Sequence, residues 1–127
     1  MSSIKLKSKI EELYKVNDFV NNMIAQENMD INLIIEEIFA NIISYSGCSY
    51  VIVNAMFDES TNILRLEFVD DGIKFNPLEK DDPAEPVSIE KVEIGGLGIF
   101  LTKNIADDMQ YKYADNENHL IITKKVK

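Results

Sequence analysis

Residues 49–69 read SYVIVNAMFDESTNILRLEFV, and this stretch decides the fold. Two runs rich in β-branched and aromatic residues, 49–57 and 63–69, flank the polar segment 58–62. Such runs form strands, and a short polar segment between two of them is typical of a hairpin loop. The stretch therefore predicts two antiparallel strands joined as a hairpin.

The residues before this hairpin predict one more strand and two helices. Apolar side chains alternate with polar ones over residues 4–10, which indicates a strand, and recur every three or four residues over 12–27, which indicates a helix. A second helix is predicted from Asp30, a favourable N-cap residue, to about Ser46. Gly47 is expected to end that helix.

The residues after the hairpin predict a long loop, a helix and a second hairpin. Residues 76–94 contain all three prolines and many acidic residues, and so long a loop in a compact domain is usually functional or disordered. A helix is predicted from about Gly98 to Met109, followed by strands at 110–115 and 119–126. The order β-α-α-β-β-loop-α-β-β predicts an α+β fold, a two-layer α/β sandwich whose mixed, mainly antiparallel sheet carries helices on one face.

Length and charge restrict what the chain can do. Its 127 residues suit one domain, which we place at 1–127. A formal net charge of −9 disfavours nucleic acid and anionic lipid, so we expect neither a nucleic-acid nor a membrane partner. Cys48 is the single cysteine, which excludes an internal disulfide and favours a cytoplasmic location. The single histidine, His119, is expected at an exposed loop end.

Two polar motifs adjoin apolar segments. Glu37 and Asn41 are four residues apart at the edge of the second helix's apolar face, so they would look into a cleft. Taken alone, such a pair is more simply an incidental polar pair. Asp70 and Gly72 follow the second hairpin strand, where Asp-Gly normally forms a turn. A carboxylate is also a pure acceptor suited to the exocyclic amine of adenine, and glycine would let the backbone come close to the ring.

A third motif is glycine-rich. Gly95, Gly96, Leu97 and Gly98 precede the predicted third helix, and exposed N–H groups at a helix N-terminus suit phosphate. The motif is neither a Walker A loop nor a dinucleotide fingerprint. Taken alone, it is explained at least as well by a flexible hinge.

In their order and spacing, the three motifs together resemble those of the GHKL ATPase superfamily, which includes histidine kinases, type II topoisomerases and mismatch-repair ATPases. Residues 37–41 resemble its N box, residues 70–72 with Phe75 its G1 box, and residues 95–101 its G2 box. The likeness covers nearly the whole chain. It is greatest to the stand-alone anti-sigma factor serine/threonine-protein kinases.

The resemblance implies a role for each motif. Asn41 would ligate Mg²⁺ through its side-chain oxygen, and Glu37 would be the general base for a substrate serine or for water. An ATP lid would occupy residues 76–95. With ATP and Mg²⁺ as cofactors, the cofactor-binding residues would be Asn41, Asp70, Gly72, Phe75, Gly95, Gly96, Leu97 and Gly98.

The resemblance also implies an ATP-dependent serine/threonine protein kinase that phosphorylates a small antagonist of the STAS (anti-anti-sigma) fold, binds a sigma factor and forms a homodimer. The alternative is a nucleotide-gated protein-binding switch with little or no kinase activity, and Glu37 favours the kinase. A catalytic fragment of a histidine kinase is a third, less favoured interpretation. Ile121 stands where a threonine near the nucleotide is usual, and Thr123 on the same strand face could replace it. Ser44 and Tyr45 stand where many relatives carry a basic residue or a histidine.

Overall fold

A computed structural model describes residues 1–79 and 94–126. The strands and α-helices follow one another in the predicted order, and two short 3₁₀ helices are added. The elements are β1 (Ser2–Lys7), η1 (Ile10–Glu12), α1 (Leu13–Ile24), α2 (Met29–Tyr45), β2 (Tyr50–Asp58), β3 (Ile63–Asp70), η2 (Pro77–Glu79), α3 (Ile94–Ile105), β4 (Asp108–Ala114) and β5 (Glu117–Lys125).

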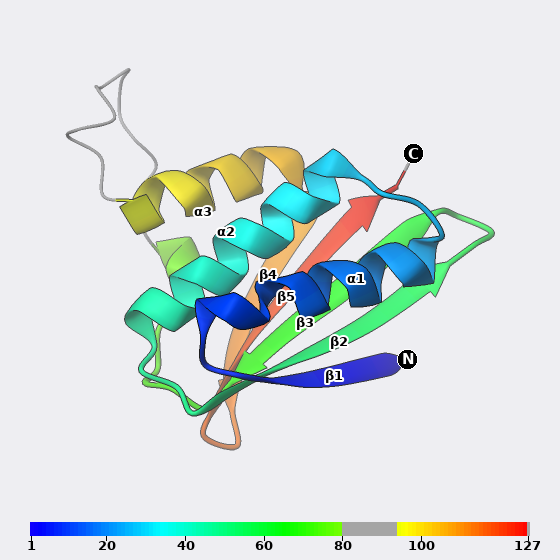
Figure 1. The fold of residues 1–127 in the computed structure, drawn as a ribbon. Coiled ribbons are helices and arrows are strands. Elements are labelled where there is room, and N and C mark those ends of the chain that lie inside the picture. The colour runs from blue at the N-terminus through cyan, green and yellow to red at the C-terminus, as the bar shows by residue number, and fades with distance from the viewer. Residues whose placement is uncertain (80–93, 127) are drawn as a thin grey trace.

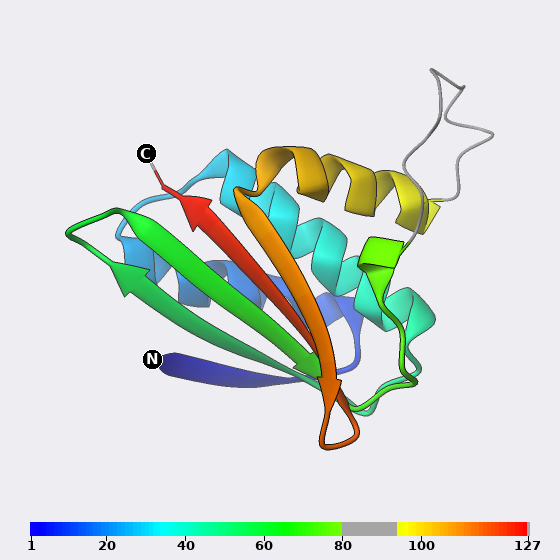
Figure 2. The same cartoon turned by 180° about the vertical axis from the view of Figure 1, so that it is seen from behind.

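The strands form one five-stranded sheet in the order β1-β2-β3-β5-β4. Every neighbouring pair is antiparallel, so the predicted mainly antiparallel sheet is wholly antiparallel over the described strands. All three α-helices lie on one face of the sheet, and the other face is left open by them (Figures 1 and 2). The α+β, two-layer architecture predicted from the sequence is therefore confirmed.

The core lies between the sheet and the helices. Strand residues that face the helices are apolar and buried, as the alternation along β2 and β5 requires. Helix α2 contributes the most buried side chains of any helix, because its apolar residues recur at helical spacing. Its buried apolar residues are Ile31, Ile34, Ile35, Ile38, Phe39 and Ile42.

Two helix starts differ from the prediction. Helix α2 is capped by Asn28, whose side chain accepts a hydrogen bond from the Ile31 N–H at 3.0 Å, and Asp30 lies in the first turn. Both Asn and Asp are good capping residues, so the sequence left the choice open. Helix α3 begins at Ile94, before the glycines, and ends at Ile105. Its packing against α2 outweighs the low helix propensity of glycine.

The second hairpin is tighter than predicted. Its turn consists of Asp115 and Asn116, both with positive φ, which is the geometry of a two-residue hairpin turn. Asn118 therefore belongs to β5 instead of the turn, and His119 lies two residues inside the strand instead of at its start. His119 is partly buried on the open face, where its Nδ1 lies 3.0 Å from Glu67 Oε2, so the expected exposed loop end is wrong.

Within the described residues, no helix is both long and apolar enough to span a bilayer.

Candidate functional site

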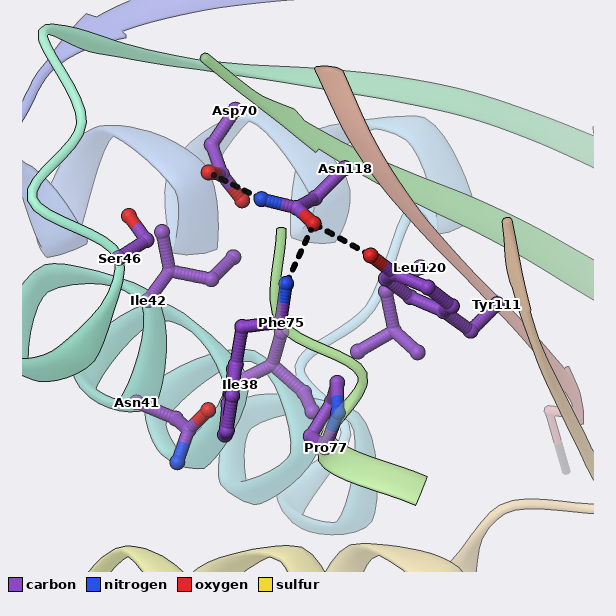
Figure 3. Close-up of a pocket in the computed structure, with 10 residues that line it drawn as sticks. All are labelled: Ile38, Asn41, Ile42, Ser46, Asp70, Phe75, Pro77, Tyr111, Asn118 and Leu120. Atoms are coloured by element: carbon purple, nitrogen blue, oxygen red, sulfur yellow. Dashed lines mark hydrogen bonds between the residues drawn. The ribbon is translucent and has the colours of Figure 1, made fainter. Parts of the chain in front are cut away.

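A pocket lies where the end of β3 and the start of β5 meet helix α2 (Figure 3). It encloses about 20 Å³, which is room for about one water molecule. Apolar walls with a few polar groups are typical of small-molecule sites. The apolar lining residues are Ile38, Ile42, Phe75, Pro77 and Leu120, and the polar ones are Asn41, Ser46, Asp70, Tyr111 and Asn118.

Asp70 forms part of the polar side of this pocket. Its side chain is 3% exposed, and its Oδ1 accepts hydrogen bonds from the Gly72 N–H at 2.9 Å and from Asn118 Nδ2 at 3.1 Å. Burial raises the pKa of the Asp70 carboxyl above its ordinary value, although these two donors oppose the rise. A buried carboxylate with oxygen capacity left over is suited to accept from a ligand N–H.

The next two residues hold the turn in place. Asp71 Oδ1 accepts from the backbone N–H groups of Ser49 and Tyr50, at 2.7 and 3.2 Å, and so ties the turn to the start of β2. Gly72 lies against Ser46, and a Cβ at residue 72 would come within 2.6 Å of the Ser46 Cβ and Oγ. Gly72 therefore packs closely against the C-cap of α2. The approach to a base expected of Gly72 stays a prediction.

Phe75 continues the pocket wall. Its backbone N–H donates to Asn118 Oδ1 at 3.0 Å, and its ring lies 6.2 Å from that of Tyr45, centroid to centroid. Tyr45, one of the positions where relatives differ, thus supports a pocket residue from outside.

Asn41 reaches the same pocket from α2. It is 6% exposed, and its Nδ2 is buried with no hydrogen-bond partner among the described residues. A buried amide group without a partner is costly, which makes it a candidate for contact with a ligand.

Glu37 lies one helical turn before Asn41, beside α3 instead of the pocket lining. Its Oε2 packs against Gly98 so closely that a Cβ at residue 98 would overlap the carboxylate. Burial raises the pKa of Glu37, and the charge of Glu36 adds to the rise. A carboxyl with a raised pKa is a stronger base than an ordinary one.

The glycine motif lies within α3 instead of in a loop before it. Gly95 and Gly96 occupy the first turn, where backbone N–H groups have no partner within the helix. Gly98 belongs to the second turn, so its N–H falls within the helical ladder, contrary to the phosphate-binding role expected of it. Its lack of a side chain instead makes room for Glu37.

The residue beside Asp70 on β5 was missed by the sequence reasoning. Asn118 pairs directly with Asp70, whereas Ile121 and Thr123 lie on the opposite, open face of the strand. Thr123 therefore cannot replace a threonine near the pocket. Alternation back from the buried Leu120 could have placed Asn118 on the pocket face, but a turn was assigned there.

A family model for the histidine kinase-like ATPase domain matches residues 6–124. The chain belongs to this family. The match spans both polar motifs, the glycine motif and the whole sheet except residues 2–5 of β1 and Lys125 at the end of β5. The chain is thus an ATP-binding, kinase-like ATPase domain of the GHKL type. A search of curated proteins found no match.

Membership of the histidine kinase-like ATPase family gives the pocket its ligand class. The buried Asp70 carboxylate can accept a hydrogen bond and the unpartnered Nδ2 of Asn41 can donate one, which fits a nucleotide that offers both donors and acceptors. The enclosed volume of about 20 Å³ is smaller than a base, so a bound base would extend beyond it or displace its walls. The predicted lid, residues 76–95, falls mostly on 80–93, which lie outside the described residues.

Proposed function

We propose that the chain is an ATP-dependent serine/threonine protein kinase and an anti-sigma-type regulator, which phosphorylates a small antagonist protein of the STAS fold. The placement of Glu37 carries this proposal. The carboxylate is partly buried between α2 and α3, its pKa is raised, and Asn41 follows one turn later on the same helix. These are the properties of a general base held beside a nucleotide site.

The proposed chemistry is a phosphoryl transfer. The hydroxyl oxygen of a substrate serine or threonine attacks the γ-phosphorus of ATP, the bond to the β–γ bridging oxygen breaks, and ADP leaves. Glu37 accepts the hydroxyl proton as the new oxygen–phosphorus bond forms. Asp70 holds the base of the nucleotide through an accepted hydrogen bond, and the N–H groups at the start of α3 face the phosphates.

Mg²⁺ is part of the proposal, with Asn41 as the protein ligand through its side-chain oxygen. Among the described residues no group of three or more His, Cys, Asp or Glu side chains could hold a metal ion. Mg²⁺ commonly takes one or two protein oxygens and completes its shell with phosphates and water, so a single amide suffices. When bound, the ion neutralises developing charge on the phosphates.

The alternative is a nucleotide-gated switch that binds a partner and transfers phosphoryl groups slowly or never. The small enclosed volume of about 20 Å³ supports it, because a nucleotide that displaced Phe75 or its neighbours on entry would couple binding to a change of conformation. A sigma factor as second partner, a homodimer and a cytoplasmic location stay predictions.

The test starts with proteins captured from native cells by the chain, with and without ATP. Each captured protein is then incubated with the purified chain and ATP labelled at the γ-phosphate. Labelled serine or threonine in a captured partner supports the kinase. Release of an unlabelled partner on ATP binding supports the switch, and the kinase assignment would then be wrong.

A further inference from the structure

Asn118 uses its whole hydrogen-bonding capacity inside the protein (Figure 3). Its Nδ2 donates to Asp70 Oδ1 at 3.1 Å and to the Ile73 carbonyl at 2.8 Å. Its Oδ1 accepts from the Phe75 N–H at 3.0 Å and from the Tyr111 hydroxyl at 2.5 Å. An amide has two donor hydrogens and two acceptor lone pairs, so this side chain, which is 4% exposed, is fully satisfied.

These four hydrogen-bond partners permit only one orientation of the Asn118 amide. If the Asn118 group were turned over, its oxygen would face Asp70 Oδ1 and the Ile73 carbonyl, both of which are acceptors. Its NH₂ would face the N–H of Phe75, which is a donor. The turned amide would therefore lose its bonds and bring like groups together. The NH₂ is fixed on the side of Asp70.

The fixed amide determines how Asp70 is used. Both the Asn118 Nδ2 and the Gly72 N–H donate to Oδ1, and neither donates to Oδ2. Oδ2 accepts from neither of these two donors, and we take it as the oxygen that accepts from a ligand in the pocket, which Asp70 lines together with Ser46. The Ser46 hydroxyl is a third group that lowers the pKa of Asp70. The same amide holds the backbone at Ile73 and Phe75, so the acceptor and the adjoining wall are fixed by one side chain.

We propose that Asn118 is a positioning residue that directs Asp70 Oδ2 toward the ligand and so gives the site its preference for a base with an exocyclic amine over one with a carbonyl. The inference rests on the nucleotide-binding part of the proposed function. An amine at C6 of the purine donates to the held carboxylate, whereas a carbonyl there brings two acceptors together. Without the Asn118 donor, Asp70 can turn or take up a proton, and a protonated carboxyl can donate to the carbonyl.

The experiment compares the dissociation constants of ATP and ITP, which carry an amine and a carbonyl at C6. A matched pair of variants, Asn118→Thr and Asn118→Val, differs only in a hydroxyl against a methyl group, and both residues suit a strand. We expect the parent to prefer ATP by at least about tenfold, which corresponds to one charge-assisted hydrogen bond. The Thr variant should keep much of this preference, and the Val variant should fall below about threefold.

Two further variants separate positioning from general loosening of β5. His119→Asn changes the adjacent residue, which lies on the open face, and should leave the ATP-to-ITP ratio unchanged. Asp70→Asn gives the ratio expected when the preference for ATP over ITP is completely lost, because the introduced amide can donate to the carbonyl of ITP. Circular dichroism of each variant verifies that it is folded.

Several results would overturn the inference. Equal ATP-to-ITP ratios in the Thr and Val variants would exclude a positioning role for the Asn118 donor. So would an ATP-to-ITP ratio that falls as far in His119→Asn as in Asn118→Val. If the Val variant does not fold, Asn118→Ser and Asn118→Ala replace the pair, and equal ratios in these two variants are decisive against the inference. A parent that binds ATP and ITP equally overturns this inference alone, while a parent that binds neither overturns the proposed function as well.

Discussion

The carboxylate of Glu37 on α2 packs directly against Gly98 on α3, in the space that any side chain at residue 98 would fill. Glycine within a helix costs about 1 kcal/mol relative to alanine, so its presence needs a reason. The contact provides that reason, because it allows the two helices to hold the proposed base between them. The sequence motif predicts phosphate binding at all three glycines, but its last glycine has a different role, which is to make room for Glu37.

Gly98→Ala is expected to separate folding from catalysis. Alanine favours the helix by up to about 1 kcal/mol, and the atom it meets is the far end of a flexible side chain, so the midpoint of thermal unfolding should stay or rise. The displaced Glu37 carboxylate should lower kcat roughly 10- to 100-fold. Calorimetry and the labelled-ATP assay measure the two effects, and a variant with unchanged kcat would show that the contact does not position the base.

Glu37→Gln is expected to abolish phosphoryl transfer and to leave ATP affinity within about twofold of the parent. The amide has the same shape but is not a base, and its nucleophile partner is absent from the ATP-bound ground state. Glu36→Gln is the matched control, because Glu36 is exposed on the same helix. Transfer at the parent's rate by the Glu37 variant would rule out Glu37 as the base.

The rate of phosphoryl transfer should fall at acid pH as the Glu37 carboxylate takes up a proton. Burial and the charge of Glu36 raise the pKa of Glu37 above 4.5, and only the ionised form can accept a proton. The rate should therefore decline as the pH falls through a value above 4.5. In Glu36→Gln this decline should move to lower pH, since a like charge is removed. A profile that is flat down to pH 4.5, or one that the control leaves unmoved, would contradict this.

The sequence predicted the elements well because their patterns are local. Alternation in β2 and β3 and helical spacing in α2 are enough to place them. The start of α3 could not be predicted this way, since Gly95 and Gly96 disfavour a helix and only packing against α2 supports one. The place of Asn118 could not be predicted for a different reason. Turn-like residues continue after Asp115 and Asn116, so the sequence predicts a longer turn than the two residues that form it.

The candidate site was predicted in part. Asp70 and Asn41 line one pocket as the motif order indicated, and Phe75 joins them. The contributions of Tyr111 and Asn118 depend on which strands become neighbours, and that of Ser46 depends on where the end of α2 lies against the sheet. A single sequence does not state either arrangement. Pairing of β3 with β5 brings Asp70 opposite Asn118 across 48 positions of chain, and no local pattern reports such a pair.

Gly72→Ala is expected to damage both stability and nucleotide binding. The added Cβ meets the backbone oxygen as well as the side chain of Ser46, so a rotamer change cannot remove the overlap. We expect a loss of about 1–3 kcal/mol in the free energy of unfolding, and weaker ATP binding because Gly72 donates to Asp70. The control is Gly47→Ala, where φ is +63° and no atom lies within 4 Å. That change should cost about 1 kcal/mol and leave ATP affinity unaltered.

Asp70→Asn is expected to weaken ATP binding roughly 10- to 100-fold, as for a lost charge-assisted hydrogen bond, without destabilising the free protein. Burial raises the pKa of Asp70 in the folded state above 3.8. Between 3.8 and that raised value the folded protein holds a proton that the unfolded chain has lost, so this group's contribution to stability declines as the pH rises. Removal of the charge should make the variant as stable as the parent at pH 7, or more stable.

Asp71→Asn, at the adjacent residue, is the matched control. We expect its effect on stability at pH 7 to have the opposite sign to that of Asp70→Asn. Burial raises the pKa of Asp71, but the N–H groups of Ser49 and Tyr50 outweigh that effect and hold it below 3.8. Its stabilising contribution is therefore present above 3.8 and is lost as the pH falls through the lowered value, so Asp71→Asn should be less stable than the parent at pH 7. Urea unfolding of the three proteins from pH 2 to pH 7, with ATP titrations at pH 7, tests both signs. If Asp70→Asn is the less stable of the two variants, Asp70 serves the turn, and its buried charge is not held for a ligand.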